Sequence, residues 1–277
     1  MIDFIKKIVI AIVQGIAEIL PISSSGHILI TSELLNVESS LQFAIFLHFG
    51  SLVAMIVYYW KDIFNIIVSL FNFLFKKNRE ENTLYYCSLF LKLVVASIPA
   101  AILGILLSDL IDSYFSNLYF VFTFLIITGI LLLINKNLNG EKTLKELKYK
   151  DAFCIGLFQG VGLFPGISRS GVTIFGSKVM RLSNEEAAHF SFLMFLPVTA
   201  GSFLLEVIGD FEAISFNEPL VLLSDLACVI IAALTTFFAV KYLFKIIKKG
   251  KLYYFAYYCF AIALIGIITC LICNYGF

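Results

Sequence analysis

Three consecutive serines followed by a glycine and a histidine form the first group of residues that can carry out chemistry. The hydroxyls of Ser23, Ser24 and Ser25, with free backbone N–H groups at a helix start, can bind phosphate oxygens. His27 can act as a general acid, a base or a nucleophile near neutral pH. A helix-capping cluster would also use serines, but it would not require a histidine. We therefore predict that Ser24 and His27 are catalytic and that Ser23 and Ser25 bind substrate.

The second group surrounds an arginine, Arg169, in an otherwise apolar region. Arginine is always charged, and its planar fork matches phosphate oxygens. A structural ion pair with Glu18 would explain the charge but not the cluster of hydrogen-bond donors around it. We predict that Arg169 is catalytic and that its neighbours bind a phosphate group: Gly166, Ser168, Ser170, Gly171 and Thr173.

A third chemical feature is an acidic residue, Glu18, inside an apolar segment. An ionisable side chain at membrane depth is costly and indicates function by default. Gln14 lies four residues earlier, so both side chains share one face of a helix. We predict a catalytic role for Glu18. His48 lies beside Gly50 and Ser51 in a predicted span, where helix packing explains its polarity better than a site role does.

The elements that must position these residues are membrane helices. The chain has 277 residues, of which 60% are hydrophobic and 14% charged, and its mean hydropathy is +0.96. Soluble proteins have about 25% charged residues, so we predict a single all-α polytopic membrane domain over residues 1–277. The net charge of +1 gives no indication of nucleic-acid binding. The predicted spans are 41–60, 84–108, 115–135, 187–208, 219–241 and 253–273.

Lysine and arginine residues orient the spans. They gather in the connections 61–83, 136–151 and 241–251, and they are absent from 36–40, 109–117 and 209–218. The first set is therefore predicted to face the cytoplasm. Two shorter apolar segments, 8–35 and 152–180, are broken by a proline and a serine-glycine cluster, which membrane proteins tolerate where the break lines a wet cavity.

The two broken segments repeat each other at a constant offset of 145 residues. Gln14-Gly15 leads to Ser23 and Gly26, and Gln159-Gly160 leads to Ser168 and Gly171. Each half, approximately 1–140 and 146–277, would be one re-entrant helical hairpin followed by three transmembrane helices. Because three is odd, the second copy must insert upside down. We therefore predict an inverted-topology repeat with a shared site near the midplane. The alternative for 8–35, favoured by Lys6 and Lys7, is one kinked crossing with the N-terminus inside.

At these motifs the sequence resembles the undecaprenyl-diphosphatase family, membrane phosphatases associated with bacitracin resistance. The resemblance lies in five places: Gln14 to Glu18, Pro21 to His27, Pro165 to Thr173, Ile98 to Ala101, and Phe190 to Phe192 leading to Pro197. It therefore covers most of the chain.

The resemblance implies hydrolysis of undecaprenyl diphosphate, which recycles the lipid carrier of cell-wall synthesis in the bacterial plasma membrane. It also implies an active site reached from outside and a divalent cation, Mg²⁺ or Ca²⁺. Gln14 stands where some members have glutamate, so we expect Glu18 and Gln14 to hold the cation together with phosphate oxygens of the substrate. By position, the functional residues would be Glu18, Ser24, His27, Ser168, Arg169 and Thr173.

Several alternatives stay open from the sequence. The attacking group is His27, Ser24, or a water activated by His27. A polyprenyl-phosphate flippase without hydrolysis would use the same inverted architecture, although a Ser-His pair is more than binding requires. A second lipid-phosphatase family would need a Lys-x₆-Arg-Pro motif, and this chain has no Arg-Pro dipeptide. The sequence does not decide between a monomer and a homodimer.

Overall fold

A computed structural model describes residues 2–37, 41–115, 117–209 and 219–273, and these residues form helices with no strand. The elements in chain order are α1 (Ile2–Ile19), α2 (Ser24–Leu35), α3 (Leu41–Tyr58), α4 (Trp60–Phe75), α5 (Glu81–Leu110), the π-helical turn η1 (Ile111–Phe115), α6 (Leu118–Asn135), α7 (Tyr149–Val161), α8 (Arg169–Val179), α9 (Asn184–Gly209), α10 (Pro219–Lys248) and α11 (Tyr254–Cys273). The prediction of an all-helical membrane protein is confirmed. The predicted outer connections 36–40 and 209–218 lie largely outside the described residues.

Five helices in the described part of the chain are long and apolar enough to cross a membrane: α5, α6, α9, α10 and α11. They correspond to five of the six predicted spans. The sixth candidate is a bent pair, because α3 and α4 meet at an angle of 72°. The break falls at Tyr59, between the end of α3 and the start of α4. The chain therefore crosses a bilayer several times.

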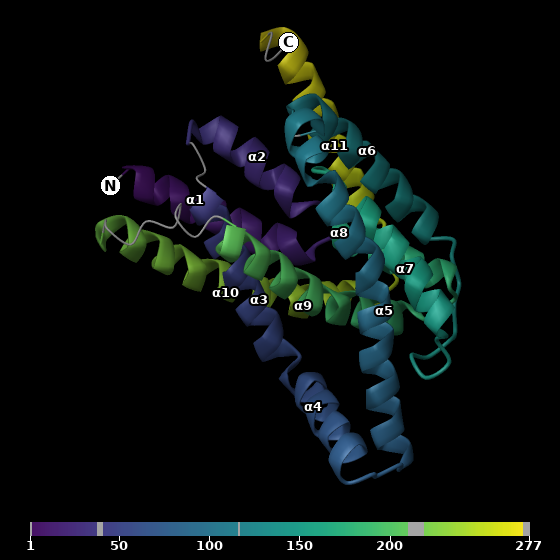
Figure 1. Ribbon diagram of the computed structural model, residues 1–277. Helices are drawn as coiled ribbons and strands as arrows, with labels where there is room; N and C mark the ends of the chain where they lie inside the picture. The colour runs from purple at the N-terminus through teal and green to yellow at the C-terminus, as the bar shows by residue number, and fades with distance from the viewer. Residues whose placement is uncertain (1, 38–40, 116, 210–218, 274–277) are drawn as a thin grey trace.

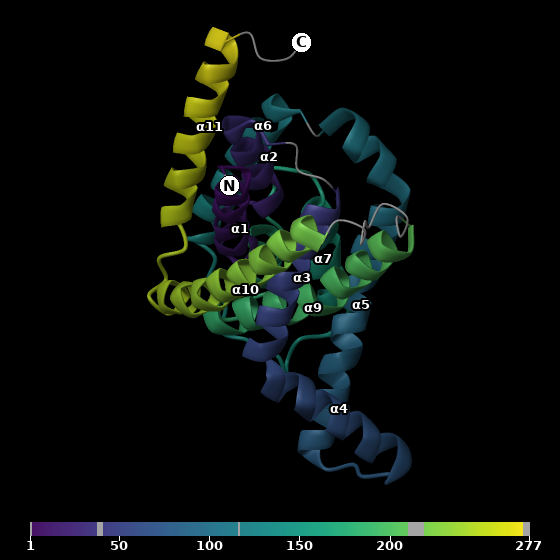
Figure 2. The same cartoon turned by 90° about the vertical axis from the view of Figure 1, so that its left-hand side faces the viewer.

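The predicted connection over 61–83 was wrong for most of its length, because α4 occupies it. Lys61 lies in the first turn of α4 and Lys76 directly follows its last residue, so charged residues at both ends concealed the apolar helix between them. Large apolar side chains on α4, including Phe64 and Phe71, are exposed. Figures 1 and 2 show α4 and the start of α5 projecting together from the body of the protein.

The two broken segments are helix–turn–helix units, as predicted. α1 and α2 are separated by residues 20–23, and α7 and α8 by residues 162–168. Ser23 is the N-cap of α2 and accepts a hydrogen bond from the Gly26 N–H, at 3.3 Å. Ser168 is the N-cap of α8 and accepts one from the Gly171 N–H, at 3.1 Å. Equivalent serines at the offset of 145 therefore start both second helices.

Each helix–turn–helix unit begins and ends at the same end of the molecule. For the first unit, Asp225 near the start of α10 binds Lys7 of α1 at 2.7 Å and Gln42 of α3 at 3.5 Å. For the second, the Lys142 N–H donates to the Arg181 carbonyl oxygen at 3.0 Å, so the chain before α7 meets the chain after α8. Both units are therefore hairpins.

The two hairpins open toward opposite ends of α10. The first hairpin is tied to Asp225 at the start of α10, whereas Lys248 at its end lies 3.5 Å from Glu185, just after the second hairpin. A helix of 30 residues spans roughly 45 Å. The tips of the hairpins therefore approach each other between these ends. A hydrophobic core around them includes the fully buried Phe190 and Phe192 of α9.

Candidate functional site

A cavity of about 260 Å³ lies where the two hairpin tips meet. It is bounded by α1 and the start of α2 from the first hairpin, by α7 and the start of α8 from the second, and by α3 and α9. Its polar lining consists of Glu18, Ser23, Ser24, Ser25, His48, Gln159, Ser168, Arg169, Thr199 and Ser202. Most of the polar groups predicted from the two motifs therefore share one space.

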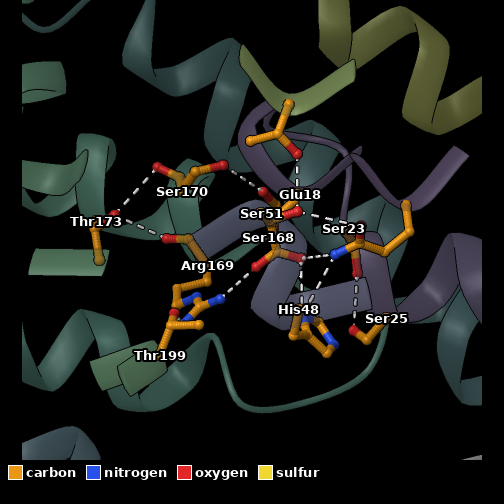
Figure 3. Close-up of polar contacts among 12 residues, drawn as sticks. Glu18, Ser23, Ser25, His48, Ser51, Ser168, Arg169, Ser170, Thr173 and Thr199 are labelled. Carbon is orange, nitrogen blue, oxygen red and sulfur yellow. Dashed lines mark hydrogen bonds and ion pairs between the residues drawn. The ribbon is translucent and has the colours of Figure 1, made fainter. Parts of the chain in front are cut away.

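An ion pair between the hairpins is the centre of this site (Figure 3). A guanidinium nitrogen of Arg169 lies 2.6 Å from Glu18 Oε1, and another donates to Thr199 Oγ1 at 2.9 Å. The Arg169 guanidinium also lies 4.8 Å from the centre of the Phe195 ring. The Glu18 side chain is 1% exposed, and a buried carboxylate is tolerated only when it is paired and hydrogen-bonded. The structural pairing weighed as an alternative for Arg169 therefore exists, inside the cavity.

The second carboxylate oxygen of Glu18 faces α3 and its own helix. Gln14 Nε2 donates to Glu18 Oε2 at 3.2 Å, and His48 Nδ1 lies 3.3 Å from the same oxygen. Ser51 donates to Gln14 Oε1 at 3.2 Å, which fixes the amide orientation in which nitrogen points at the carboxylate. The Ser24 side chain also interacts with the carboxylate. Glu18 therefore joins α1, α2, α3 and α8.

Two helix starts point their capping serines at the cavity. Ser23 to Ser25 belong to the start of α2, and Ser168 and Arg169 to the start of α8. The first N–H groups of a helix have no partner within the helix and favour anions. Ser23 Oγ also accepts a hydrogen bond from the Gly166 N–H at 3.1 Å, so the two motifs contact each other directly. The arrangement suits an anion with two phosphate groups.

The break before α8 is held in place by α6. Thr128 donates to the Gly166 carbonyl oxygen at 3.0 Å and accepts from the Ser168 N–H at 3.0 Å. Gly166 has a φ of +98°, and a Cβ there would lie 2.3 Å from the Val121 carbonyl oxygen. Glycine is therefore required at this position by backbone conformation and by the close approach of α6.

Some of the predicted substrate-binding residues support the site without lining the cavity, as far as the described residues show. Thr173 donates to the Arg169 carbonyl oxygen at 2.9 Å and is in short contact with Ser191 of α9. Ser170 donates to the Leu20 carbonyl oxygen at 3.4 Å, and Gly171 donates its N–H to Ser168. These contacts fix the start of α8, and their roles in binding stay predictions.

His27 is not among the described residues that line the cavity. Its Nδ1 lies 2.8 Å from the Ser23 carbonyl oxygen, and its Nε2 lies 2.8 Å from the hydroxyl of Tyr258 on α11. The two rings also stack, with centroids 5.6 Å apart. Both ring nitrogens thus have hydrogen-bond partners. The imidazole holds the Ser23 loop on the side that faces away from the cavity.

Sequence reasoning missed four polar cavity residues: His48, Gln159, Thr199 and Ser202. His48 was interpreted as packing polarity, but it lies beside Glu18. Thr199 of α9 is a partner of Arg169, and nothing in the sequence around it indicated this. Gln159 is 1% exposed, and its amide has no hydrogen-bond partner among the described protein groups. The repeat could have indicated Gln159, because it lies 145 residues after Gln14 and is its equivalent in the second half.

Comparison with known proteins agrees with this architecture. Residues 7–265 match the family described as bacitracin resistance protein BacA. The chain is 40% identical over 261 residues to a protein named undecaprenyl-diphosphatase from Thermosipho africanus (strain TCF52B), covering 94% of this chain and 98% of that one. It is 39% identical over 269 residues to one of the same name from Halothermothrix orenii, covering 96% and 98%. A third, from Methanococcus vannielii, is 38% identical over 260 residues, covering 94% and 97%. The chain thus belongs to the bacitracin resistance protein BacA family.

Proposed function

We propose that this chain hydrolyses undecaprenyl diphosphate to undecaprenyl phosphate and inorganic phosphate, and so recycles the lipid carrier of cell-wall synthesis. The observation that carries the proposal is the meeting of Arg169 with two serine-capped helix starts in one cavity at the hairpin tips. Relatives covering nearly the whole chain carry the name of this activity. The prenyl tail would stay in lipid while the diphosphate enters the cavity.

The cavity groups match the charge that develops in phosphoryl transfer. In this reaction, negative charge spreads over the oxygens of the transferred group, and positioned donors stabilise it. Arg169 would turn part of its fork from Glu18 and Thr199 to the phosphate oxygens, because bidentate binding of phosphate is among the strongest interactions of guanidinium. The Ser23 and Ser168 regions would hold the two phosphate groups through the helix starts.

Ser24 is the better-placed nucleophile of the two predicted side chains, because it lines the cavity and interacts with Glu18, whereas His27 faces Tyr258. Its oxygen would bond to the terminal phosphorus while the anhydride P–O bond breaks and undecaprenyl phosphate leaves. The serine proton would pass to Glu18, which lies within reach of His48. Water would then cleave the phosphoserine and release phosphate.

A divalent cation fits the protein groups only in part. The described residues contain no cluster of three histidine, cysteine or acidic side chains, and Glu18 already binds Arg169 through one oxygen. Gln14 directs its amide nitrogen toward Glu18. A cation would therefore need oxygens from the substrate. The requirement for Mg²⁺ or Ca²⁺ stays a prediction, tested by adding EDTA and restoring either ion.

The decisive experiment measures phosphate release from undecaprenyl diphosphate by the purified protein. Ser24→Ala and Arg169→Ala should abolish release, whereas Arg79→Ala, at an exposed site after α4, should leave it unchanged. Release at the wild-type rate by both cavity variants would show that the site is wrongly assigned. No release by the wild type would favour the flippase alternative.

We also propose that the cavity is reached from the outer side of the cell membrane. Ser202 lines the cavity on α9 and is exposed, so a Ser202→Cys variant reports access. An impermeant thiol reagent added to intact cells should label it, and labelling confined to inside-out vesicles would contradict the proposal. Homodimer formation stays a prediction, checked by the mass of the protein in detergent.

A further inference from the structure

A second hollow, separate from the cavity at the hairpin tips, lies beside the junction of α10 and α11. It is a groove of about 710 Å³, bounded by the last turn of α1 and the break that follows it, the last turns of α10 and the start of α11. Figure 2 shows α10 running into α11 at this corner of the protein. We call it the lysine groove after Lys245, Lys249 and Lys251, which line it.

The charge of the lysine groove is of one sign. Its lining includes three lysines and no acidic residue among those that the structure describes. Lys248, on the same helix, does have a carboxylate partner, Glu185 at 3.5 Å, but Lys248 does not line the groove. The three lining lysines are all exposed. They are therefore free to converge on a phosphate group, whose charge complements theirs.

The rest of the lining has the character of a membrane interface. Ile16, Leu20 and Ile22 form an apolar wall from the first hairpin, and Ile16 is 38% exposed. Tyr242 and Tyr254 are 59% and 52% exposed, which is typical of tyrosines at the level of lipid head groups. A molecule with a negative head and an apolar chain would satisfy the lysines and the apolar wall together. An isolated phosphate ion would leave the wall without a partner.

The lysine groove also contacts the motif that lines the cavity. Tyr258 lines the groove, and its hydroxyl is the partner of His27 Nε2 at 2.8 Å. His27 Nδ1 in turn lies 2.8 Å from the Ser23 carbonyl oxygen. A molecule in the groove would therefore rest against the residue that fixes the Ser23 loop from behind.

We propose that the lysine groove binds an anionic glycerophospholipid. Its phosphate would lie on Lys245, Lys249 and Lys251, and an acyl chain would lie along the apolar wall. The lysines give the site its preference for a net negative head group, because each basic residue near a membrane surface attracts anionic lipid. The apolar wall makes the ligand a lipid rather than a soluble anion. The lysine groove is separate from the cavity at the hairpin tips, and lipid binding there can be measured without the hydrolytic reaction.

The test is native mass spectrometry of the purified protein in detergent with equal amounts of phosphatidylglycerol and phosphatidylcholine. We expect the wild type to retain phosphatidylglycerol preferentially. The combined variant Lys245→Gln, Lys249→Gln and Lys251→Gln should lower the ratio of the two bound lipids by roughly fivefold or more, since three attractive charges are lost. The matched control removes the same number of exposed lysines elsewhere: Lys61→Gln, Lys76→Gln and Lys77→Gln.

The proposal predicts that the control variant keeps the wild-type ratio. An equal loss of preference in both variants would show that only general charge attraction operates, and would overturn the site. Equal retention of the two lipids by the wild type would overturn it as well. An Ile16→Glu variant, which keeps the lysines and places a negative charge on the exposed part of the apolar wall, should also lose phosphatidylglycerol. Unchanged retention by this variant would remove the acyl-chain wall from the proposal.

Discussion

Arg169 pairs with Glu18 across the two halves of the cavity, and its geometry leads to the first prediction. Arg169 contacts Glu18 and Thr199 through different guanidinium nitrogens. Arg169→Lys keeps the positive charge but loses the fork, so it cannot make both contacts or bind phosphate bidentately. We expect kcat/KM for phosphate release to fall by about 10²- to 10³-fold, as for removal of one transition-state donor.

The matched control is Arg181→Lys, which changes an exposed arginine after α8. It should retain wild-type kcat/KM. If Arg169→Lys is as active as the wild type, charge alone suffices, and the bidentate role proposed for Arg169 is wrong.

The position of the attacking group gives a second prediction. During turnover of substrate labelled in the terminal phosphate, rapid acid quenching should trap label on Ser24, because this residue lines the cavity. Phosphoserine survives acid, whereas phosphohistidine is lost in acid and survives in alkali, so a parallel sample is quenched in alkali to detect acid-labile label. A His27→Asn variant should lose activity because the Ser23 loop is displaced. The wild type should carry no acid-labile label that depends on His27. Acid-labile label in the wild type that disappears in His27→Asn would place the nucleophile on the histidine.

At the residue scale, the sequence predicted the chemical types well and their contacts less well. Arg169 and Glu18 were unusual enough in apolar segments to be identified by composition alone. The place of His48 depended on how α3 packs against α1, which no local pattern reveals. The contacts of His27 were hidden for the same reason, since its partner Tyr258 is 231 residues away, and its catalytic role stays a prediction.

At the scale of elements, the break before α8 should be sensitive to one methyl group. Gly166→Ala would force a Cβ against the Val121 carbonyl oxygen, 2.3 Å away, at a φ of +98°. We expect a loss of stability of roughly 2 kcal/mol, from strain and overpacking. The midpoint of thermal unfolding in detergent measures it.

Gly201→Ala is the natural control, because a Cβ at Gly201 of α9 would lie within 4 Å of no atom of the described residues. It should leave the midpoint unchanged or raise it slightly, since alanine favours helix over glycine. Equal destabilisation by both substitutions would mean that the conformation at Gly166 is not the constraint.

The hairpins were predictable as elements because proline, glycine and serine interrupt long apolar runs. The structure adds that Ser23 and Ser168, which are equivalent in the repeat, are the N-caps of α2 and α8. The helix α4 was not predictable in the same way. Its terminal lysines resemble a cytoplasmic connection, whereas the structure shows a helix there that packs against α5.

At the scale of the whole molecule, the packing of helices follows the repeat. α1 packs against α10, and its counterpart α7 packs against α5; α3 packs against α10, and its counterpart α9 packs against α5. Because α5 and α10 are also counterparts, each contact within one pair of helices has an equivalent contact between their counterparts in the other half. This exchange supports the inverted repeat, which stays a prediction with respect to the membrane. Motif spacing indicated the repeat, but the sequence alone left the side of the N-terminus open.

Labelling of the N-terminus tests that orientation. The contact of Lys7 with Asp225 places the start of α1 beside the start of α10, at the end predicted to face outward. A cysteine introduced as Asp3→Cys should therefore react with an impermeant thiol reagent from outside intact cells. Glu80→Cys, in the lysine-rich stretch before α5, should react only in inside-out vesicles. Reaction of Asp3→Cys only from inside would instead show that residues 8–35 form one kinked crossing with the N-terminus inside.

The amide of Gln159 has no hydrogen-bond partner among the described residues, so we expect it to lower the stability of the empty protein and to raise the affinity for substrate. A buried amide without a partner costs roughly 1–3 kcal/mol, and a phosphate oxygen that accepts its N–H would recover part of this on binding. Gln159→Met, similar in length and apolar, should therefore raise the thermal midpoint of the empty protein while raising KM. An unchanged KM would show that the Gln159 amide does not contribute to substrate binding. Part of the binding free energy of the substrate would then come from satisfying a buried amide that lacks a hydrogen bond in the empty protein.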